Sequence, residues 1–392
     1  MDELGRDRVA ALRAYCAEAA VQLREIGPEI DHAPDRIAKW LELPAVHVLR
    51  ACTVPDSYMD RPLRIGRHTY DMRSCLEHTV TWEALSYGDA GAVLASPGPS
   101  MSGVTVDALG NDAQRDWYFT RLGQAPTWTF FALTEPEKGS AAVELTATLT
   151  PDGDGFVLDG AKRYVGNGAH AQLGVAFCRR GPGPLGIEVV LVDTADPGFH
   201  AEVLPTVGLR GARITAMTFD RVRIPRERVL GLERKPTRRG LVGGIRTLLR
   251  FRPVLAGMAL GLARSALDHV QEQRPALAGV PRLRLAELSD RVAAARAQTF
   301  RVAAEIDAGR LRPDHIAAVK LRAAELAEES TLLAADLMGQ ASLLEDPWLN
   351  KLYRDARAFE FKEGTGQIHR LGVFQGVLKG SFLPDDGGGG PC

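Results

Sequence analysis

The chain has 392 residues, of which 45% are hydrophobic and 25% charged, as in an ordinary globular protein. Its 48 basic and 49 acidic residues leave a formal net charge of -1, so no overall field favours nucleic acid or an anionic membrane as a partner. Five cysteines without CxxC spacing argue against a metal centre or a disulfide framework. No apolar stretch approaches the ~18 residues that span a bilayer, and the charged first residues differ from a secretory signal, so we expect a cytoplasmic protein.

Helical periodicity dominates the first part of the chain. Apolar residues such as Leu12, Cys16 and Leu23 recur at the spacing of one helix face. Proline-containing stretches at 54–67 and 96–100 interrupt this pattern. Residues 1–125 are therefore predicted to form an N-terminal helical domain.

Short runs of β-branched and aromatic residues, separated by turn signals, characterise residues 126–231. The run Thr127–Phe131 opens this region, and Pro151–Gly155 has the composition of a turn before the next run. Alternation of this kind is typical of strands. The sequence therefore predicts a middle antiparallel β domain.

Long stretches rich in alanine, leucine, arginine and glutamate follow, with few helix breakers. They predict a C-terminal four-helix bundle over residues 232–384. The last segment, 385–392, is rich in glycine and has nothing to bury, so we expect a disordered tail. The predicted fold class is α+β, with the helical domain first, the β domain in the middle and the bundle last.

The first segment that carries chemistry runs from Phe131 to Ser140 and reads Phe-Ala-Leu-Thr-Glu-Pro-Glu-Lys-Gly-Ser. Pro136 keeps the residue before it extended, while a glycine near the end lets a bulky planar ligand approach the backbone. On its own, the segment also fits a turn between a strand and a polar loop. It resembles the flavin-contacting loop of the acyl-CoA dehydrogenases. The resemblance implies a substrate contact from Ser140 and flavin contacts from Phe131, Leu133, Thr134, Gly139 and Ser140.

A second segment, Asp159–Gly168, ends with the Asn-Gly chemistry of a β-hairpin turn. It resembles the family's Gly-x-Lys-x-Trp-Ile-Thr-Asn strand, which lies beside the isoalloxazine ring. Tyr164 stands at the tryptophan position and keeps an aromatic wall, whereas Gly166 stands where a threonine hydroxyl commonly bonds near flavin N5. The resemblance implies that Tyr164 and Gly166 contact the flavin. The exchange at Gly166 opens the question of which electron acceptor the flavin serves.

The most specific segment is Tyr353–Ile368, in which Arg-Asp-Ala precedes Glu-Gly-Thr-Gly-Gln-Ile. Removal of a proton beside a thioester needs a carboxylate in a dry pocket, where burial raises its pKa and its strength as a base. A lone acid at a helix end, by contrast, is usually a solvated surface charge. The segment resembles the family's catalytic turn, which implies that Glu363 is the catalytic base. By the same resemblance, Gly364 contacts the substrate, and Thr365 and Gln367 contact the adenosine diphosphate part of FAD.

Two arginines complete the implied site. Arg252 matches an arginine that lies near the thioester pocket in relatives, although an arginine before Pro253 is also ordinary at the surface where a helix begins. Arg274 corresponds to an arginine that reaches a flavin bound to the neighbouring subunit. The resemblance therefore implies FAD at a subunit interface in a homodimer or homotetramer. The sequence shows no metal-ligand spacing, so no metal is expected.

The resemblance covers nearly the whole chain and implies FAD-dependent α,β-dehydrogenation of an acyl thioester to the trans-2-enoyl thioester. CoA or an acyl carrier protein would carry the acyl group, and an electron-transfer flavoprotein or another acceptor would reoxidise the flavin. An oxidase or flavin monooxygenase on the same fold, which passes electrons to oxygen, is the alternative. A non-catalytic scaffold without flavin is a further class.

A basic connector lies between the β domain and the helices that follow it. Its cationic residues are Arg234, Lys235, Arg238, Arg239, Arg246, Arg250 and Arg252. A solvated basic face is the ordinary interpretation. The alternative hypothesis is that the connector receives a phosphate of CoA or of a phosphopantetheine arm, together with the acidic face of a carrier protein.

Overall fold

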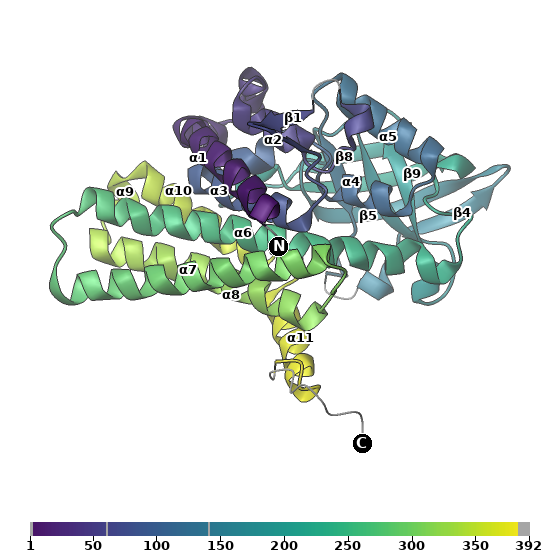
Figure 1. Ribbon diagram of the computed structural model, residues 1–392. Coiled ribbons are helices and arrows are strands. Elements are labelled where there is room, and N and C mark those ends of the chain that lie inside the picture. The colour runs from purple at the N-terminus through teal and green to yellow at the C-terminus, as the bar shows by residue number, and fades with distance from the viewer. Residues whose placement is uncertain (1–2, 60–61, 140–141, 383–392) are drawn as a thin grey trace.

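The computed structural model describes residues 3–59, 62–139 and 142–382. Figure 1 shows an elongated arrangement, with a twisted sheet toward one end and long helices that extend toward the other. The order along the chain is helices, then a sheet, then helices. This order confirms the predicted α+β fold class.

The N-terminal helices are α1 (Glu3–His32), α2 (Pro44–Ala51), α3 (Cys75–Ala95), α4 (Ser100–Leu109) and α5 (Asp112–Gln124). α3 begins where the Ser74 hydroxyl accepts a hydrogen bond from the backbone amide of Glu77. It packs against both α1 and the long helix α6 (Gly240–Gln273). Glycine permits the close approach to α1, because a Cβ at Gly88 would come 2.1 Å from the carbonyl oxygen of Ala20.

A short hairpin interrupts this helical segment, which the sequence did not predict. Its strands are β1 (Leu63–Ile65) and β2 (His68–Tyr70), which pair antiparallel. Gly66, at φ +56, supplies a left-handed residue for the turn between them. Strands of three residues are too short for the alternation of apolar and polar residues to stand out in the sequence.

In the described residues, seven strands form one sheet in the order β3-β6-β4-β5-β9-β8, with β7 beside β6. Their bounds are β3 (Thr129–Ala132), β4 (Thr148–Asp152), β5 (Gly155–Val165), β6 (Leu173–Arg179), β7 (Ile187–Asp193), β8 (Phe199–Val203) and β9 (Thr215–Ile224). Most neighbours are antiparallel, but β6 runs parallel to both β3 and β4. The sheet is therefore mixed around β6, whereas the sequence predicted an antiparallel β domain. Parallel pairing needs a long connection, and the β4–β5 hairpin lies in the connection between β3 and β6.

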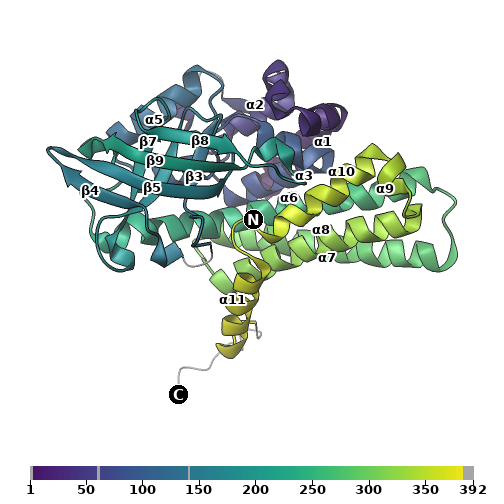
Figure 2. The ribbon, with the colours of Figure 1, turned by 180° about the vertical axis from the view of Figure 1, so that it is seen from behind.

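The long helices of the C-terminal segment are α6, α7 (Gly279–Asp307) and α8 (Pro313–Met338), which lie side by side (Figure 2). The shorter α9 (Ser342–Glu345) leads into α10 (Pro347–Ala356), which contacts α6 and α8. The last helix, α11 (Gly366–Leu378), packs on α8 and then projects away from the bundle in both views. Throughout the described ranges, each helix is too short or too polar to cross a membrane.

A buried charge cluster joins all parts of the fold. The ammonium group of Lys351 in α10 lies 2.8 Å from Asp89 in α3 and 2.6 Å from Asp355 in α10. The other carboxylate oxygen of Asp355 accepts a hydrogen bond from the backbone amide of Leu209, in the β8–β9 loop, at 2.5 Å. Burial opposes the charged form of Lys351, but the two carboxylates outweigh it and raise its pKa. The N-terminal helices, the sheet and the C-terminal helices therefore meet at this Lys351 cluster.

Candidate active site

A buried ion pair holds the first two motifs together. The ammonium group of Lys162 on β5 lies 2.8 Å from Oε1 of Glu135, and it also donates to the carbonyl oxygen of Leu133 at 3.1 Å. The Glu135 carboxylate accepts further hydrogen bonds from the backbone amides of Thr146 and Ala147 and from the Thr146 hydroxyl. Burial favours the neutral acid, but these hydrogen bonds outweigh it and hold the pKa of Glu135 below its usual value. The pair therefore fixes the loop of the first motif on β5.

The predicted contacts of the first motif lie on this fixed loop. Those that are partly buried are Phe131, Leu133 and Thr134. Gly139 is exposed, with no atom within 4 Å of the place where a Cβ would lie. The backbone amide of Arg163 donates to the carbonyl oxygen of Thr134 at 2.9 Å, which brings the second motif beside the first. Ser140 lies outside the described residues, so its contacts with flavin and substrate stay predictions.

The second motif presents an exposed aromatic ring. A register shift between Lys162 and Val165 interrupts the pairing of β5 with β9, and Tyr164 in this shift has φ +62. Its side chain is 61% exposed as a result. Gly166 nearby has room for a side chain, since the nearest atom to an added Cβ would be the carbonyl oxygen of Ala212 at 3.7 Å, an ordinary van der Waals contact. The structure therefore leaves this surface accessible to a ligand.

Glu363 lies in a left-handed turn, residues 361–365, which precedes α11 and is called the Glu363 turn below. Glu363 has φ +54 and Gly364 has φ +104. The left-handed conformation costs a residue with a side chain on the order of 1–2 kcal/mol, so surrounding contacts must hold it. One of them is the Glu360 carboxylate, which accepts a hydrogen bond from the backbone amide of Gly366 at 2.7 Å.

Cations from two helices lie around Glu363. Nε of Arg252 on α6 donates to the carbonyl oxygen of Glu363 at 3.1 Å. Nζ of Lys320 on α8 donates to the carbonyl oxygen of Gly364 at 3.2 Å. Burial raises the pKa of the Glu363 carboxyl, and the charges of Lys362, Arg252 and Lys320 act against this rise. The result is a partly buried carboxylate with raised basicity, as abstraction of a proton from carbon requires.

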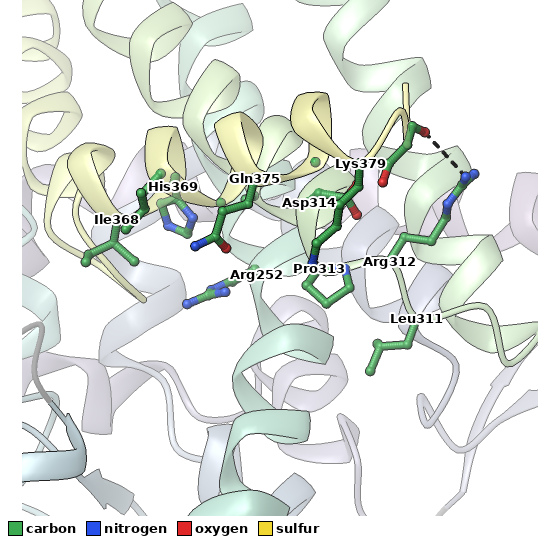
Figure 3. A pocket seen from close by; sticks show the side chains of 14 residues that line it. Arg252, Leu311, Arg312, Pro313, Asp314, Ile368, His369, Gln375 and Lys379 are labelled. Carbon is green, nitrogen blue, oxygen red and sulfur yellow. Dashed lines mark hydrogen bonds between the residues drawn. The ribbon is translucent and has the colours of Figure 1, made fainter. Parts of the chain in front are cut away.

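A cavity of about 520 Å³ lies beside the Glu363 turn, between α11 and the start of α8 (Figure 3). Its polar lining residues are Arg252, Arg312, Asp314, His369, Gln375, Lys379 and Ser381. In Figure 3, Arg252 and His369 lie toward one end of the cavity and Arg312 toward the other. The cationic lining suits phosphate oxygens. The sequence did not predict this cavity, because its lining comes from α6, α8 and α11, which are far apart in the chain.

The remaining predicted contacts lie at the ends of helices. Thr365 is the N-cap residue of α11 and is partly buried, whereas Gln367 in the first turn is exposed. Arg274 follows Arg252 by 22 positions along α6, which corresponds to about 33 Å. Its Nη2 donates to the carbonyl oxygen of Met338 at 3.0 Å. Arg274 is thus far from the Glu363 turn of its own chain, and its contact with a neighbouring subunit's flavin stays a prediction.

The basic connector does not form one continuous free surface, which corrects the interpretation from sequence. Arg239 is 8% exposed, because its guanidinium lies 2.8 Å from the buried Glu188 on β7. Arg234 donates to the carbonyl oxygen of Ala108 at 2.7 Å. Other connector cations that bond within the chain are Arg250 and Arg252. Those that remain exposed are Lys235, Arg238 and Arg246.

Lys320 is a site residue that the sequence analysis missed. It lies four residues from both Ile316 and Ala324 on α8, and all three side chains are buried. A lysine on an apolar helix face is a signal of a buried charge. Periodicity alone cannot say which atoms such a charge bonds, because its partners come from a turn about 40 positions later in the chain.

Sequence comparison shows the family. Residues 130–222 match the family model of the acyl-CoA dehydrogenase middle domain, and residues 239–378 match that of the acyl-CoA dehydrogenase C-terminal domain. The chain is 31% identical to the acryloyl-CoA reductase (NADH) of Anaerotignum propionicum, over 69% of this chain and 71% of that protein. It is 29% identical to an acyl-CoA dehydrogenase of Bacillus subtilis (strain 168), over 94% of this chain and 97% of that protein. The chain belongs to the acyl-CoA dehydrogenase family, and it is an oxidoreductase that acts on acyl thioesters.

Solved structures share this fold at low sequence identity. The glutaryl-coenzyme A dehydrogenase in complex with glutaryl-CoA has a TM-score of 0.81 at 20% identity, covering 97% of this chain and 96% of that chain. The prolyl acyl carrier protein oxidase AnaB has a TM-score of 0.81 at 21% identity, covering 94% of this chain and 98% of that chain. At such identities the likeness establishes the fold alone.

Lys162→Met should destabilise the protein and lower the amount of flavin that it binds, because the Glu135 carboxylate would stay buried without its cation. Breaking a buried ion pair in this way costs about 3–5 kcal/mol. Urea unfolding and the flavin absorbance per protein measure the two effects. Lys138→Gln is the matched control, since it removes an exposed ion pair with Glu144 in the same loop and should change little. A Lys162→Met protein as stable and as yellow as this control would contradict the structural role of the pair.

Proposed function

We propose that the protein is an FAD-dependent dehydrogenase that converts an acyl thioester to the trans-2-enoyl thioester, with Glu363 as the base. The observation that carries this proposal is the Glu363 turn. Side chains from α6 and α8 bond its backbone, and burial raises the pKa of its carboxyl. A solvated surface acid, which is the alternative for a carboxylate at a helix end, would have neither property.

The surface around the first two motifs fits a large planar cofactor. Gly139 borders open space, Gly166 has no close contact to an added Cβ, and the exposed ring of Tyr164 offers a face for stacking. The hydroxyls of Thr134 and Thr365 can bond polar groups of the ligand. Further residues that we assign to FAD are Phe131, Leu133, Gln367 and, from a neighbouring subunit, Arg274. Bound oxidised FAD would supply the acceptor for the hydride that leaves the β-carbon of the substrate.

Glu363 supplies the other half of the reaction. In the proposal, its carboxylate takes the proton from the α-carbon, and its backbone N–H donates to the thioester carbonyl, where negative charge develops. Burial makes the carboxylate a stronger base, while the nearby charges of Arg252 and Lys320 favour its ionised resting form. The proton would go to Glu363 and the hydride to bound FAD, so formation of the carbon–carbon double bond needs no further reactant.

The carrier of the acyl group would approach through the cationic cavity beside the Glu363 turn. Arg252, Arg312 and Lys379 in its lining can bond the phosphate oxygens of CoA or of a phosphopantetheine arm. We propose that the exposed connector cations, Lys235, Arg238 and Arg246, meet the acidic face of a carrier protein outside the cavity. An electron-transfer flavoprotein would then accept the electrons from the flavin.

α11 presents an uncovered apolar face that supports a homo-oligomer. The apolar side chains on it are 53–71% exposed and belong to Leu371, Phe374, Val377 and Leu378. An exposed patch of this kind marks a protein interface. We propose that a second copy covers it in a homodimer or homotetramer, in which Arg274 reaches the neighbouring flavin.

Anaerobic titration with acyl-CoA and acyl-carrier thioesters should bleach the visible flavin band of the wild-type protein. Glu363→Gln keeps the size of the side chain but not its basicity, so it should bind FAD and thioester while bleaching about 10²–10⁴-fold more slowly. Glu345→Gln, which changes an exposed acid on α9, should bleach like the wild type. Wild-type rates in Glu363→Gln would remove Glu363 from the role of base.

The double variant Arg238→Glu, Arg246→Glu should raise the KM for a carrier-bound substrate roughly fivefold to tenfold, because it repels an acidic partner. The KM for the same acyl group on CoA should stay unchanged, and added salt should reduce the difference. Lys39→Glu is the control, because it reverses an exposed charge on the N-terminal helices. An unchanged KM for the carrier-bound substrate would rule out docking at the connector.

An oxidase on the same fold is the second candidate, and the room for a side chain at Gly166 beside the exposed Tyr164 favours it. Gly166→Thr would fill this space, since a Cβ there has 3.7 Å to its nearest neighbour. For an oxidase, we expect thioester-dependent oxygen consumption that falls in Gly166→Thr, while anaerobic bleaching continues. A dehydrogenase would consume little oxygen in either form and would need an added electron acceptor.

A further inference from the structure

The Glu363 turn needs support from outside its own residues. Glu363 and Gly364 both have positive φ, and a short turn of this kind persists only when its surroundings hold it. A Cβ on Gly364 would come 3.2 Å from Nε2 of His369 and 3.5 Å from Nη2 of Arg252. The turn therefore lies against α11 and α6. On the side of α8, the support is the side chain of Lys320.

Lys320 bonds the backbone on both sides of Glu363. Its Nζ donates to the carbonyl oxygen of Phe359 at 2.6 Å and to that of Gly364 at 3.2 Å. Phe359 lies four residues before Glu363 and Gly364 lies directly after it, so one ammonium group closes the turn. Lys320 is 2% exposed, so water has little access to its ammonium group.

Lys320 differs from the buried Lys351 in the atoms that it bonds. Lys351 pairs with two carboxylates, as a lysine in a protein interior usually does. Lys320 instead donates to carbonyl oxygens, and burial lowers its pKa to about 8, with Glu360 and Glu363 acting against this change. A buried cation of this kind costs stability. Its position is explained by what it does for the turn.

Three positive charges face Glu363. They are Arg252 from α6, Lys320 from α8 and Lys362 from the turn itself. His369 on α11 is neutral, because burial lowers its pKa to about 3. The charged groups that face Lys320 are Glu360, Glu363, Arg252 and Lys362. Lys320 is thus the positive charge that α8 brings to the base.

We propose that Lys320 is a positioning residue for the base: its ammonium group closes the Glu363 turn and keeps the Glu363 carboxylate charged before the reaction. This rests on the proposed role of Glu363. A carboxylate acts as a base when it is deprotonated, at pH values above its pKa. Loss of the positive charge at position 320 raises the pKa of Glu363, so the acidic limb of the pH profile moves to higher pH.

The pH dependence of kcat/KM for thioester oxidation tests the charge. In Lys320→Gln and Lys320→Met, the acidic limb of the pH profile should move to higher pH by about one unit. At pH values on this limb, kcat/KM should therefore be ~tenfold lower than in the wild type. Lys320→Arg keeps the charge and should keep the wild-type limb. Arg322→Gln, which removes a partly exposed cation of the same helix, should also keep it. A limb that stays in place in both neutral variants, or that moves as far in Arg322→Gln, overturns the proposal.

Hydrogen exchange of the backbone amides in residues 357–368 tests the closure of the turn without any substrate. Exchange in this segment should be faster in both neutral variants than in the wild type and Arg322→Gln, while exchange in α7 stays the same. Unchanged exchange in the neutral variants overturns the proposal. If no thioester reduces the flavin of the wild-type protein, the proposed function is wrong. The hydrogen-exchange result would still decide whether Lys320 holds the turn closed. If Lys320→Met does not fold, Lys320→Gln carries both measurements.

Discussion

A single ammonium group has to sit between two carboxylates in a dry interior, and the relative placement of the parts of this protein depends on it. Lys351 is bonded to Asp89 from α3 and to Asp355 from its own helix, and Asp355 also holds the amide of Leu209 from the sheet. Removal of the lysine would leave two buried carboxylates uncompensated, which is strongly unfavourable. The neighbouring Arg354 repeats the arrangement, because it bonds Asp31 of α1 and a carbonyl oxygen of the β8–β9 loop. The Arg-Asp-Ala sequence of α10 therefore holds the N-terminal helices, the sheet and α10 together. It also positions the Glu363 turn, which follows α10, relative to the sheet.

The same physical device recurs nearer the site. A charged side chain from one element bonds the backbone of another, so that a loop takes a shape that its own residues would not keep. Lys162 holds the loop of the first motif through Leu133, and Arg252 and Lys320 hold the Glu363 turn through carbonyl oxygens. Each of these hydrogen bonds is partly buried, which limits competition from water for the donors. The loops that we assign to flavin and substrate are thus irregular in backbone but firmly held.

The sequence was sufficient for the features that depend on local pattern. Helical periodicity and the alternation of strands predicted the order of helices, sheet and helices. It was insufficient wherever a distant partner decides the outcome. The parallel pairing of β3 with β6 depends on how the chain returns after a hairpin, and the burial of Arg239 depends on Glu188 in a strand 51 positions earlier. Lys320 shows the limit clearly: its place on an apolar helix face is visible in the sequence, whereas the carbonyl oxygens that it bonds are not.

Glu135 and Glu363, from two of the motifs that resemble those of the acyl-CoA dehydrogenases, have opposite environments. The contrast explains why Glu363 suits catalysis. The carboxylate of Glu135 is bonded directly by Lys162 and by three further donors, so its pKa is lowered and its lone pairs are occupied. Around Glu363, the cations bond the backbone instead, so they act on the carboxylate through space and leave its oxygens free to take a proton. Burial can then raise the basicity of Glu363 while the cations limit the rise. A base for carbon acids needs both properties at once, because it must be charged before the reaction and strong enough to become neutral during it.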